Sequence, residues 1–286
     1  MTNGISYRPV HFGLVFVLLI GLEVPGRANS QGIGLPGRAG DKPLEITAEK
    51  GIEWQQKAKA YIARGNARAV QGNVSVYADT LTAHYRERPD GHTQIWRIAA
   101  EKKVRIITPT QRAYGDKGVY NVDSGVLVLT GNVRLDTDND RITARDSLEY
   151  WEKRGLAVAR GDAIAIRGDN RLRADVLRAH FEKDEKGKAS VRFVDAIDNV
   201  VITTPDEIVR SNRGKYDVKT GIARLTGSVR ITRGNNQLNG ANAEINLNTG
   251  VSKLFGDGKG GVRGIFMNEK SPLLRGGAKT KSRGAR

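Results

Sequence analysis

The 286-residue sequence contains no cysteine. This absence excludes a disulfide framework, a thiolate metal site and a cysteine nucleophile. Aromatic residues make up only 6% of the chain, so side chains that stack on nucleic-acid bases are also scarce. An interior built from this composition is either filled with valine, isoleucine and leucine, or leaves room that another apolar object occupies.

Residues suited to catalysis and metal binding are similarly few. The chain has four histidines, and none belongs to a recognisable arrangement of nucleophile and base. His84 and His180 occupy equivalent places in an Ala-His-aromatic element, which favours a structural role. The acidic run at 136–140 lacks the glycine and the glutamate of a calcium loop. We therefore expect no enzymatic activity, no metal and no cofactor.

Basic residues exceed acidic residues by 47 to 31, which gives a net charge of +16. Residues 44–266 hold 37 Lys and Arg against 28 Asp and Glu, a net charge of +9, and the residues after Glu269 include six basic residues and no acid. We predict that residues 256–286 form a basic disordered tail. This charge favours solubility or an anionic partner such as a nucleic acid, a lipid head group or an acidic glycan. Nucleic acid is disfavoured, because the basic residues are dispersed among acids and are not interleaved with aromatic residues.

The one long apolar run, HFGLVFVLLIGL at 11–22, lies near the N-terminus. It follows Arg8 and precedes a small-x-small site at Ala28 and Ser30, a pattern typical of a secretory signal peptide. The run is too short to span a bilayer, which needs about 20 residues, although an uncleaved anchor is the alternative. We expect residues 1–30 to be removed on export and residues 31–43, rich in Gly and Pro, to form a flexible leader.

The chain repeats itself with an offset of 96 residues. YNVDSGVLVLTGNVRL at 120–135 returns as YDVKTGIARLTGSVRI at 216–231, and the same offset aligns further matches between about 44–135 and 140–231 without a gap. A partial third copy begins at Gln237 and ends near Phe255. The sequence therefore predicts a repeat architecture, with a first unit at 44–139 and a second unit, with the partial third, at 140–255.

Each unit is predicted to consist of short antiparallel strands, because runs rich in Val, Ile, Leu, Thr and Tyr alternate with polar residues between closely spaced turn signals. The turn signals are at 64–66, 71–73, 89–91, 123–125 and 130–132. The best helical candidate, 52–63, is also assigned to strand, since its counterpart at 148–155 has the pattern of a strand and a turn.

Alternation along the strands predicts which side chains face inward. Apolar residues occupy the odd positions of 221–231, whereas Arg224 and Arg230 occupy even positions. A slip of one residue would bury both arginines, so the register is well specified. The inward positions predicted in this way are Val74, Val76, Leu81, Val104, Ile106, Leu127, Leu129, Val133, Leu135, Leu225, Val229 and Ile231.

Several segments resemble the LptA/OstA family, whose members form the periplasmic bridge of lipopolysaccharide export. The segments are PLEITAE at 43–49, QGNV at 71–74, Ala78-Asp79-x-Leu81 and LTGNV at 129–133, and the resemblance covers about 44–255. This chain has two full units and a fraction, which is more than the shortest bridge proteins have. Kinship with the N-terminal periplasmic domain of LptD is therefore also open.

The resemblance implies an all-β fold, a twisted antiparallel β-jelly roll (OstA-like) whose repeated units form one continuous open groove. It further implies a periplasmic protein that binds lipopolysaccharide and shields its acyl chains in the groove. It also implies end-to-end association by β-strand addition with an LptC-like inner-membrane protein, an LptD-like outer-membrane protein or a second copy of the chain. Leu44 and Ile46 match the first strand of the family and Ile106 a groove position, and the repeat extends this lining to Ile142, Ile202 and Leu238. The competing interpretation is a structural β-repeat module with a filled interior.

Overall fold

The computed structural model describes residues 43–89, 91–185, 189–258 and 260–267. Its eighteen strands form one antiparallel sheet, and the described residues include no α-helix. The only helical element among them is a 3₁₀ turn, η1, at Glu152–Arg154. No described segment is a helix of the length and hydropathy needed to cross a membrane. The prediction of an all-β antiparallel fold is confirmed.

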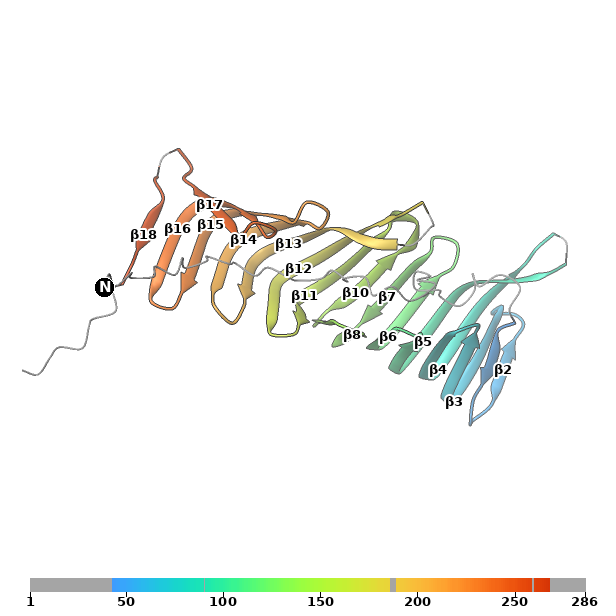
Figure 1. Cartoon of the computed structure of the whole chain (residues 1–286). Coiled ribbons are helices and arrows are strands. Elements are labelled where there is room, and N and C mark those ends of the chain that lie inside the picture. The colour runs from blue at the N-terminus through green and yellow to red at the C-terminus, as the bar shows by residue number, and fades with distance from the viewer. Residues whose placement is uncertain (1–42, 90, 186–188, 259, 268–286) are drawn as a thin grey trace, which may run out of the picture.

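Eight strands are short and ten are longer. The short strands are β1 (Glu45–Thr47), β2 (Ile52–Gln55), β7 (Val126–Thr130), β8 (Val133–Thr137), β9 (Arg141–Ala144), β10 (Ser147–Trp151), β17 (Val251–Phe255) and β18 (Arg263–Ile265). The longer strands are β3 (Ala60–Gln71), β4 (Val74–Glu87), β5 (Thr93–Ile107), β6 (Gln111–Asn121), β11 (Leu156–Arg167), β12 (Asn170–Lys183), β13 (Ala189–Thr203), β14 (Ile208–Asp217), β15 (Ile222–Arg233) and β16 (Asn236–Asn246). Figure 1 shows them side by side along an elongated ribbon.

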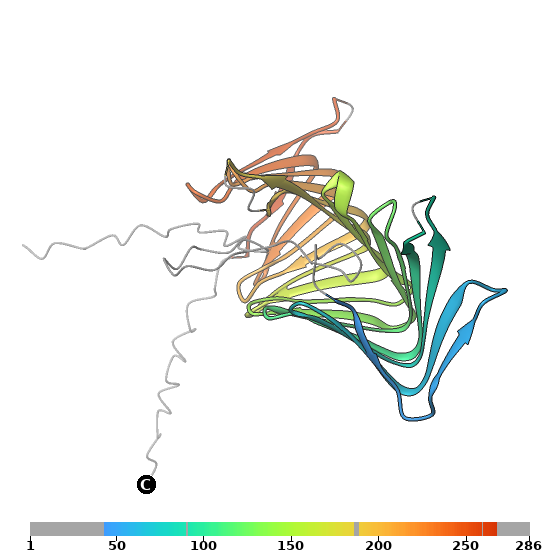
Figure 2. The ribbon, with the colours of Figure 1, turned by 90° about the vertical axis from the view of Figure 1, so that its right-hand side faces the viewer.

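The ribbon is folded lengthwise into two layers. Each longer strand gives one half to each layer, whereas a short strand lies in one layer only. We call the layer that contains β2, β7, β10 and β17 layer 1, and the layer that contains β1, β8, β9 and β18 layer 2. Seen along the ribbon, the layers meet on one side and diverge on the other, as a V (Figure 2).

Pairs of consecutive residues with positive φ lie at the bend between the layers. They are Gly65–Asn66, Lys102–Lys103, Gly131–Asn132, Gly161–Asp162, Asp198–Asn199 and Gly227–Ser228. Two left-handed residues in sequence interrupt the ladder and turn the strand, as β-bulges do. The register shifts at these places, for example between Arg64 and Ala67 in β3 and between Arg160 and Ala163 in β11.

Two of the predicted turns are therefore bends. The segment 64–66 lies inside β3, and 130–132 joins β7 in layer 1 to β8 in layer 2, two strands that do not pair with each other. The prediction of turns there was wrong, because a Gly-Asn pair supplies positive φ for a bulge as readily as for a turn. The segment 52–63 is not helical: it contains β2 and the start of β3, as predicted.

Corresponding strands of the two halves have matching bounds. Adding 96 to the bounds of β3, β4 and β5 gives the bounds of β11, β12 and β13. The division into units at 44–139 and 140–255 is an interpretation of this regularity, because the sheet itself is continuous. One part of the predicted tail is ordered, since Arg263–Ile265 form β18 and pair with Gln237–Asn239 of β16. The predicted signal peptide, the leader to residue 42 and residues 268–286 lie outside the described residues.

Candidate functional site

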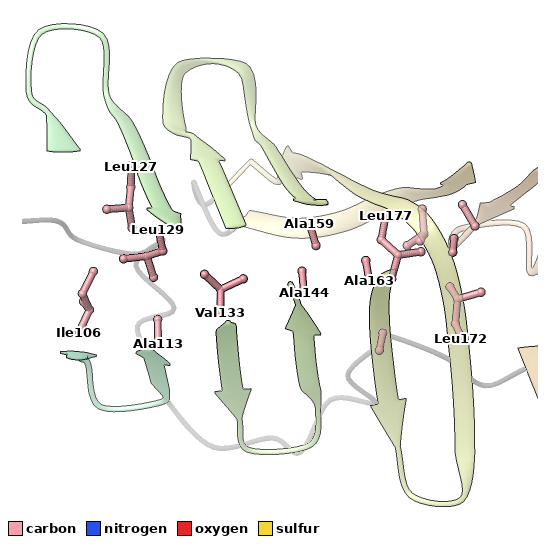
Figure 3. Close-up of a cluster of buried hydrophobic side chains, with 14 of the residues drawn as sticks. Ile106, Ala113, Leu127, Leu129, Val133, Ala144, Ala159, Ala163, Leu172 and Leu177 are labelled. Carbon is pink, nitrogen blue, oxygen red and sulfur yellow. The ribbon is translucent and has the colours of Figure 1, made fainter. Parts of the chain in front are cut away.

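The interior of the V is an apolar layer built from alternate residues of both layers. Figure 3 shows Ile106, Ala113 and Val133 of layer 2 pointing toward side chains of layer 1 that include Leu127 and Leu129. The buried apolar cluster runs without interruption from Ala63 in β3 to Ile245 in β16. A period of two places every second side chain on the same face, so one sequence pattern lines the whole length of the ribbon.

All the predicted lining residues belong to this cluster. Those that are buried are Val74, Val76, Leu81, Val104, Ile106, Leu127, Leu129, Val133, Ile202, Leu225, Val229 and Ile231. Those that are partly buried against it are Leu44, Ile46, Leu135, Ile142 and Leu238. Their position inside the V follows from the structure, whereas their contact with lipid stays a prediction.

Small side chains and tyrosines complete the lining, and sequence reasoning missed them. Ala67 and Ala163 are fully buried, at 0% exposure each. Tyr120 and Tyr216 are buried near the outer edge of layer 1. Each pair is separated by 96 residues, so the repeat alone could have identified them. The alanines keep the two layers close to each other, because they fill little of the space between them.

Two inward glycines make room for leucines. A Cβ atom on Gly118 would lie 3.0 Å from Cδ2 of Leu129, and one on Gly214 would lie 3.0 Å from Cδ2 of Leu225. Each glycine is the direct cross-strand partner of the leucine. The leucine side chain therefore leans over the glycine, and these leucines are 0% and 1% exposed.

The apolar pockets of the interior include two small ones. One, with a cavity volume of about 20 Å³, lies in the second half of the ribbon and is lined by residues that include Leu172, Val194 and Ile202. The other, also of about 20 Å³, lies at the β1–β2 end and is lined by Leu44 and Ile46 among others. Between these pockets the side chains of the two layers are buried, and most of the lining is below 6% exposed.

Polar side chains lie at the outer edge of layer 2. Three hairpins there share one turn, in which a threonine hydroxyl accepts a hydrogen bond from the backbone N–H three residues later. The hydroxyl-to-nitrogen distances are 3.1 Å for Thr108 and Gln111, 2.9 Å for Thr137 and Asp140, and 3.2 Å for Thr204 and Glu207. Ala113, two residues after Gln111, and Val209, two residues after Glu207, point into the apolar interior. By alternation Gln111 and Glu207 therefore face inward, and the apolar interior ends in a polar rim.

The charges of this rim are partly buried. Arg167 donates two hydrogen bonds to Asp140, each 2.5 Å long, and both side chains are less than 20% exposed. Glu207 is 6% exposed. Burial raises the pKa of the Glu207 carboxyl to about 7; Asp206 raises it further, and Arg233 partly opposes the shift. Glu207 therefore titrates near neutral pH, and its repeat counterpart is the uncharged Gln111.

The histidines and acids outside the interior have ordinary structural partners. His180 Nε2 lies 2.8 Å from Asp195 Oδ2 on the neighbouring strand, and the ring of His84 lies 6.0 Å from that of Trp96. A hydrogen bond from Arg192 lowers the pKa of the Asp217 carboxyl to about 2. Within the described ranges, no group of three or more His, Asp or Glu side chains is arranged to hold a metal ion.

Both ends of the ribbon have unpaired strand edges. At one end β1 and β2 pair only with β3, and at the other β17 and β18 pair only with β16, as far as the described residues extend. Apolar side chains are exposed there, including Trp54 at 59% and Phe255 at 47%. Free N–H and C=O groups along an edge are a template for pairing with another strand.

The chain is similar to two known proteins over part of its length. A 95-residue stretch is 30% identical to an uncharacterized protein of Rhizobium meliloti (strain 1021), covering 32% of this chain and half of that protein. The chain is also similar to LptH of Pseudomonas aeruginosa, described as the LptA-homologous periplasmic component of a lipopolysaccharide transport device, at 17% identity and a TM-score of 0.39. That similarity covers 45% of this chain and 95% of LptH.

The family model described as LptA/(LptD N-terminal domain) LPS transport protein matches the chain twice, at residues 45–146 and 142–251. Together these matches span nearly the whole described ribbon. The chain therefore belongs to the family of LptA and LptD N-terminal domain lipopolysaccharide transport proteins.

Proposed function

We propose that this protein binds lipopolysaccharide in the periplasm, holds its acyl chains between the two layers, and bridges the inner and outer membranes. The observation that carries the proposal is the apolar interior, which runs along the whole ribbon and reaches both open ends. Moving an acyl chain into water costs about 0.8 kcal/mol per CH₂ group. A continuous apolar interior removes most of this cost, so transport through it requires no chemical step.

The fold provides a way for the layers to separate. Strand pairing runs within each layer, and the layers are connected through the bends on one side only. The side chains that meet between the layers are short aliphatic groups such as Ala113, Val133 and Ala159 (Figure 3). Widening the V breaks no ladder hydrogen bond, and inserted acyl chains replace the contacts that the layers lose with each other. The pockets at Leu44 and at Leu172 are the places where the interior already has room.

The polar rim fits the other half of an amphiphile. Acyl chains between the layers place the sugar and phosphate groups at the open side of the V, where Gln111, Arg167 and Glu207 lie. These groups supply both donors and acceptors. The rim is therefore suited to a polar head group, whereas the interior is suited only to hydrocarbon.

A photo-crosslinking experiment tests lipid binding. We would replace Tyr150 and Tyr216, which face inward, with p-benzoylphenylalanine one at a time. Trp151 and Phe193 are the matched controls, because they are aromatic and point outward from the same layer: Trp151 follows Tyr150 on β10, and Phe193 lies on β13 beside the strand of Tyr216. We expect purified lipopolysaccharide to crosslink at the inward positions only. Equal crosslinking at all four positions, or none at the inward pair, would contradict the proposal.

The bridge requires strand addition at both ends, and it is tested separately. A proline cannot donate a ladder hydrogen bond, so Ile52→Pro in β2 and Ser252→Pro in β17, whose backbone N–H groups point away from β3 and β16, each block one edge. The β1–β2 end matches the family's LptC-facing end, so the Ile52 variant should lose capture of the LptC-like partner and keep that of the LptD-like one. The Ser252 variant should show the opposite result. Capture of both partners by both variants would refute association through these edges.

The alternative is a structural β-repeat module. It is favoured by the very low exposure of the lining, such as 0% for Leu129 and 1% for Ile202. The crosslinking experiment separates the two functions, because a permanently filled interior captures no lipid at Tyr150 or Tyr216. A charged substitution at Ile46 or Ile106 adds a second test: it should abolish lipid loading in a conduit, whereas a structural module has no loading to lose.

A further inference from the structure

The outer surface of layer 2 carries most of the net positive charge of the ribbon. Ten arginines point outward from its strands, at Arg68, Arg105, Arg112, Arg134, Arg141, Arg171, Arg173, Arg210, Arg230 and Arg263. The acidic residues that face outward from the strands of layer 2 are Glu45 and Asp136. The net charge of +8 on this one surface compares with +9 for all residues 44–266. Basic residues that are dispersed in the sequence are therefore gathered by the sheet.

Seven of these arginines lie in a single cross-strand row. The row follows the strand pairing through Arg68, Tyr77, Arg105, Tyr114, Arg134, Thr143, Ile164, Arg173, Val201, Arg210, Arg230, Asn239 and Arg263. Tyrosines alternate with arginines at its start: the guanidinium carbon of Arg105 lies 4.9 Å from the centre of the Tyr77 ring, and that of Arg134 lies 4.2 Å from the Tyr114 ring. The row contains no acidic residue. At its start the sheet interleaves basic and aromatic side chains, contrary to the expectation from the sequence, whereas from β11 to β18 the row contains no aromatic residue.

The outer surface of layer 1 is different. Its central row in the second half reads Arg178, Asp195, Lys215, Arg224, Glu244 and Lys253, so that the facing pair Lys215 and Arg224 has an acid on each side. Ion pairs join several of its charges, such as Arg224 to Glu244 at 3.1 Å and Arg160 to Glu149 at 2.7 Å. The same strands thus carry balanced charge on one outer surface and unbalanced charge on the other.

The arrangement of Arg210 and Arg230 is unfavourable in the isolated protein. They are directly opposite each other on β14 and β15, and both are exposed. No described carboxylate forms an ion pair with either of them. Like charges at directly opposite positions destabilise a sheet. A negatively charged partner that covers this surface would neutralise both arginines and remove the repulsion between them.

Apolar side chains between the arginines indicate what kind of partner fits. Ile166 of β11, Ile208 of β14 and Ile265 of β18 point outward on the same surface, and Ile166 and Ile265 are 36% and 37% exposed. A purely ionic polymer makes no use of exposed isoleucines. An anionic lipid surface uses both groups, because its phosphates pair with guanidinium groups while aliphatic side chains enter the boundary of head groups and acyl chains.

We propose that the outer surface of layer 2, from β11 to β18, docks on a membrane surface rich in anionic phospholipid. The strands of this part of the surface carry Arg171, Arg173, Arg210, Arg230 and Arg263 and no outward acidic residue, although Asp162 at the bend forms an ion pair with Arg173. The docking surface is separate from the apolar interior, because it faces away from it. It would hold the ribbon beside a membrane whether or not lipopolysaccharide occupies the interior.

The test is vesicle flotation of the full exported chain with two double variants. Arg210→Gln/Arg230→Gln removes the facing pair from layer 2. Lys215→Gln/Arg224→Gln removes two positive charges from the same two strands, at positions that also face each other, but in layer 1. Vesicles of phosphatidylcholine with about a third phosphatidylglycerol are the probe, and pure phosphatidylcholine vesicles are the lipid control.

We expect the wild-type protein and the layer 1 variant to float with the anionic vesicles at low salt, and neither to float with neutral vesicles. Partitioning of the layer 2 variant should be about thirtyfold weaker, since each arginine near an anionic surface contributes a factor of about five. Equal partitioning of all three proteins would overturn the proposal and assign binding to other basic residues, such as those after Glu269. Binding to heparin or to an acidic peptide without binding to anionic vesicles would also overturn it. Thermal unfolding of both variants shows whether weaker partitioning reflects loss of the two charges or loss of the fold. The layer 2 variant should be as stable as the wild type or slightly more stable.

Discussion

Glu207 provides a sensitive test of the polar rim, because it places a carboxyl group in a buried site with no matching charge in the other repeat. Its side chain is 6% exposed, and its backbone N–H is held by the Thr204 hydroxyl at 3.2 Å. At the corresponding position of the first half, the chain has Gln111 in the same kind of turn. Glu207→Gln should therefore keep the turn and remove only the ionisable group.

The size of the stability change expected for Glu207→Gln follows from the pKa of the Glu207 carboxyl. The pKa of Glu207 is about 7 in the folded protein and 4.5 without the fold. The folded state thus binds the proton more tightly, so its contribution to stability is fully present below pH 4.5 and is lost as the pH rises through 7. A shift of this size corresponds to about 3 kcal/mol between the two limits. Glu207→Gln should raise the free energy of unfolding at pH 8 by an amount of this order and change it little at pH 5.

Urea unfolding at pH 5 and pH 8, followed by circular dichroism, measures the effect. The reverse substitution Gln111→Glu is the matched partner, and it should create a similar loss of stability at pH 8 in the first half of the ribbon. Glu182→Gln, at a side chain that is 64% exposed, is the control and should be neutral at both pH values. If Glu207→Gln and the wild type have the same pH dependence, then Glu207 is solvated and the rim is not closed in the way the structure shows.

Three further predictions concern the interior and one ion pair. Leu129→Ala removes a fully buried side chain and should lower the free energy of unfolding by about 2–5 kcal/mol in a urea titration, whereas a negligible loss would show that the interior is loosely filled. Gly118→Val places branched carbons where a single Cβ already lies 3.0 Å from Leu129 and 3.3 Å from Val104, so it should destabilise the protein by about 1–3 kcal/mol. Equal melting temperatures of Gly118→Val and the wild type would refute that close approach. Arg192→Gln should return the pKa of Asp217 from about 2 toward its usual value, measured by NMR titration of the carboxyl carbon. The variant should be less stable than the wild type near neutral pH, and this difference should vanish as the pH falls through about 2, because the wild type loses the contribution of Asp217 there. An unchanged Asp217 pKa would show that Arg192 is not its main partner.

Much of the strand pattern could be predicted from the sequence because it depends on local rules. Alternation along 221–231 assigned Leu225 and Val229 to the interior, and both are 1% exposed. The offset of 96 transferred the same assignment to Leu129 and Val133, which are also buried. A slip of one residue would expose every one of these side chains and bury arginines, so the pattern admits one register.

The bends were misread for a physical reason. Gly131–Asn132 supplies two residues of positive φ, and a tight hairpin and a bulge between layers both use such a pair. Only the pairing partners distinguish them: β7 pairs with β6 and β10, and β8 pairs with β6 and β9. Those partners lie in other parts of the sequence, and no local pattern identifies them.

The sequence by itself determined the strands, their period, the inward face and the repeat, because each depends on residues within one strand or on a fixed offset. Tertiary structure alone decided how closely the two layers approach, since that distance depends on which alanines and glycines meet across the V. It also decided where the charge gathers. Arg210 and Arg230 lie 20 residues apart in the chain, and only strand pairing places them opposite each other.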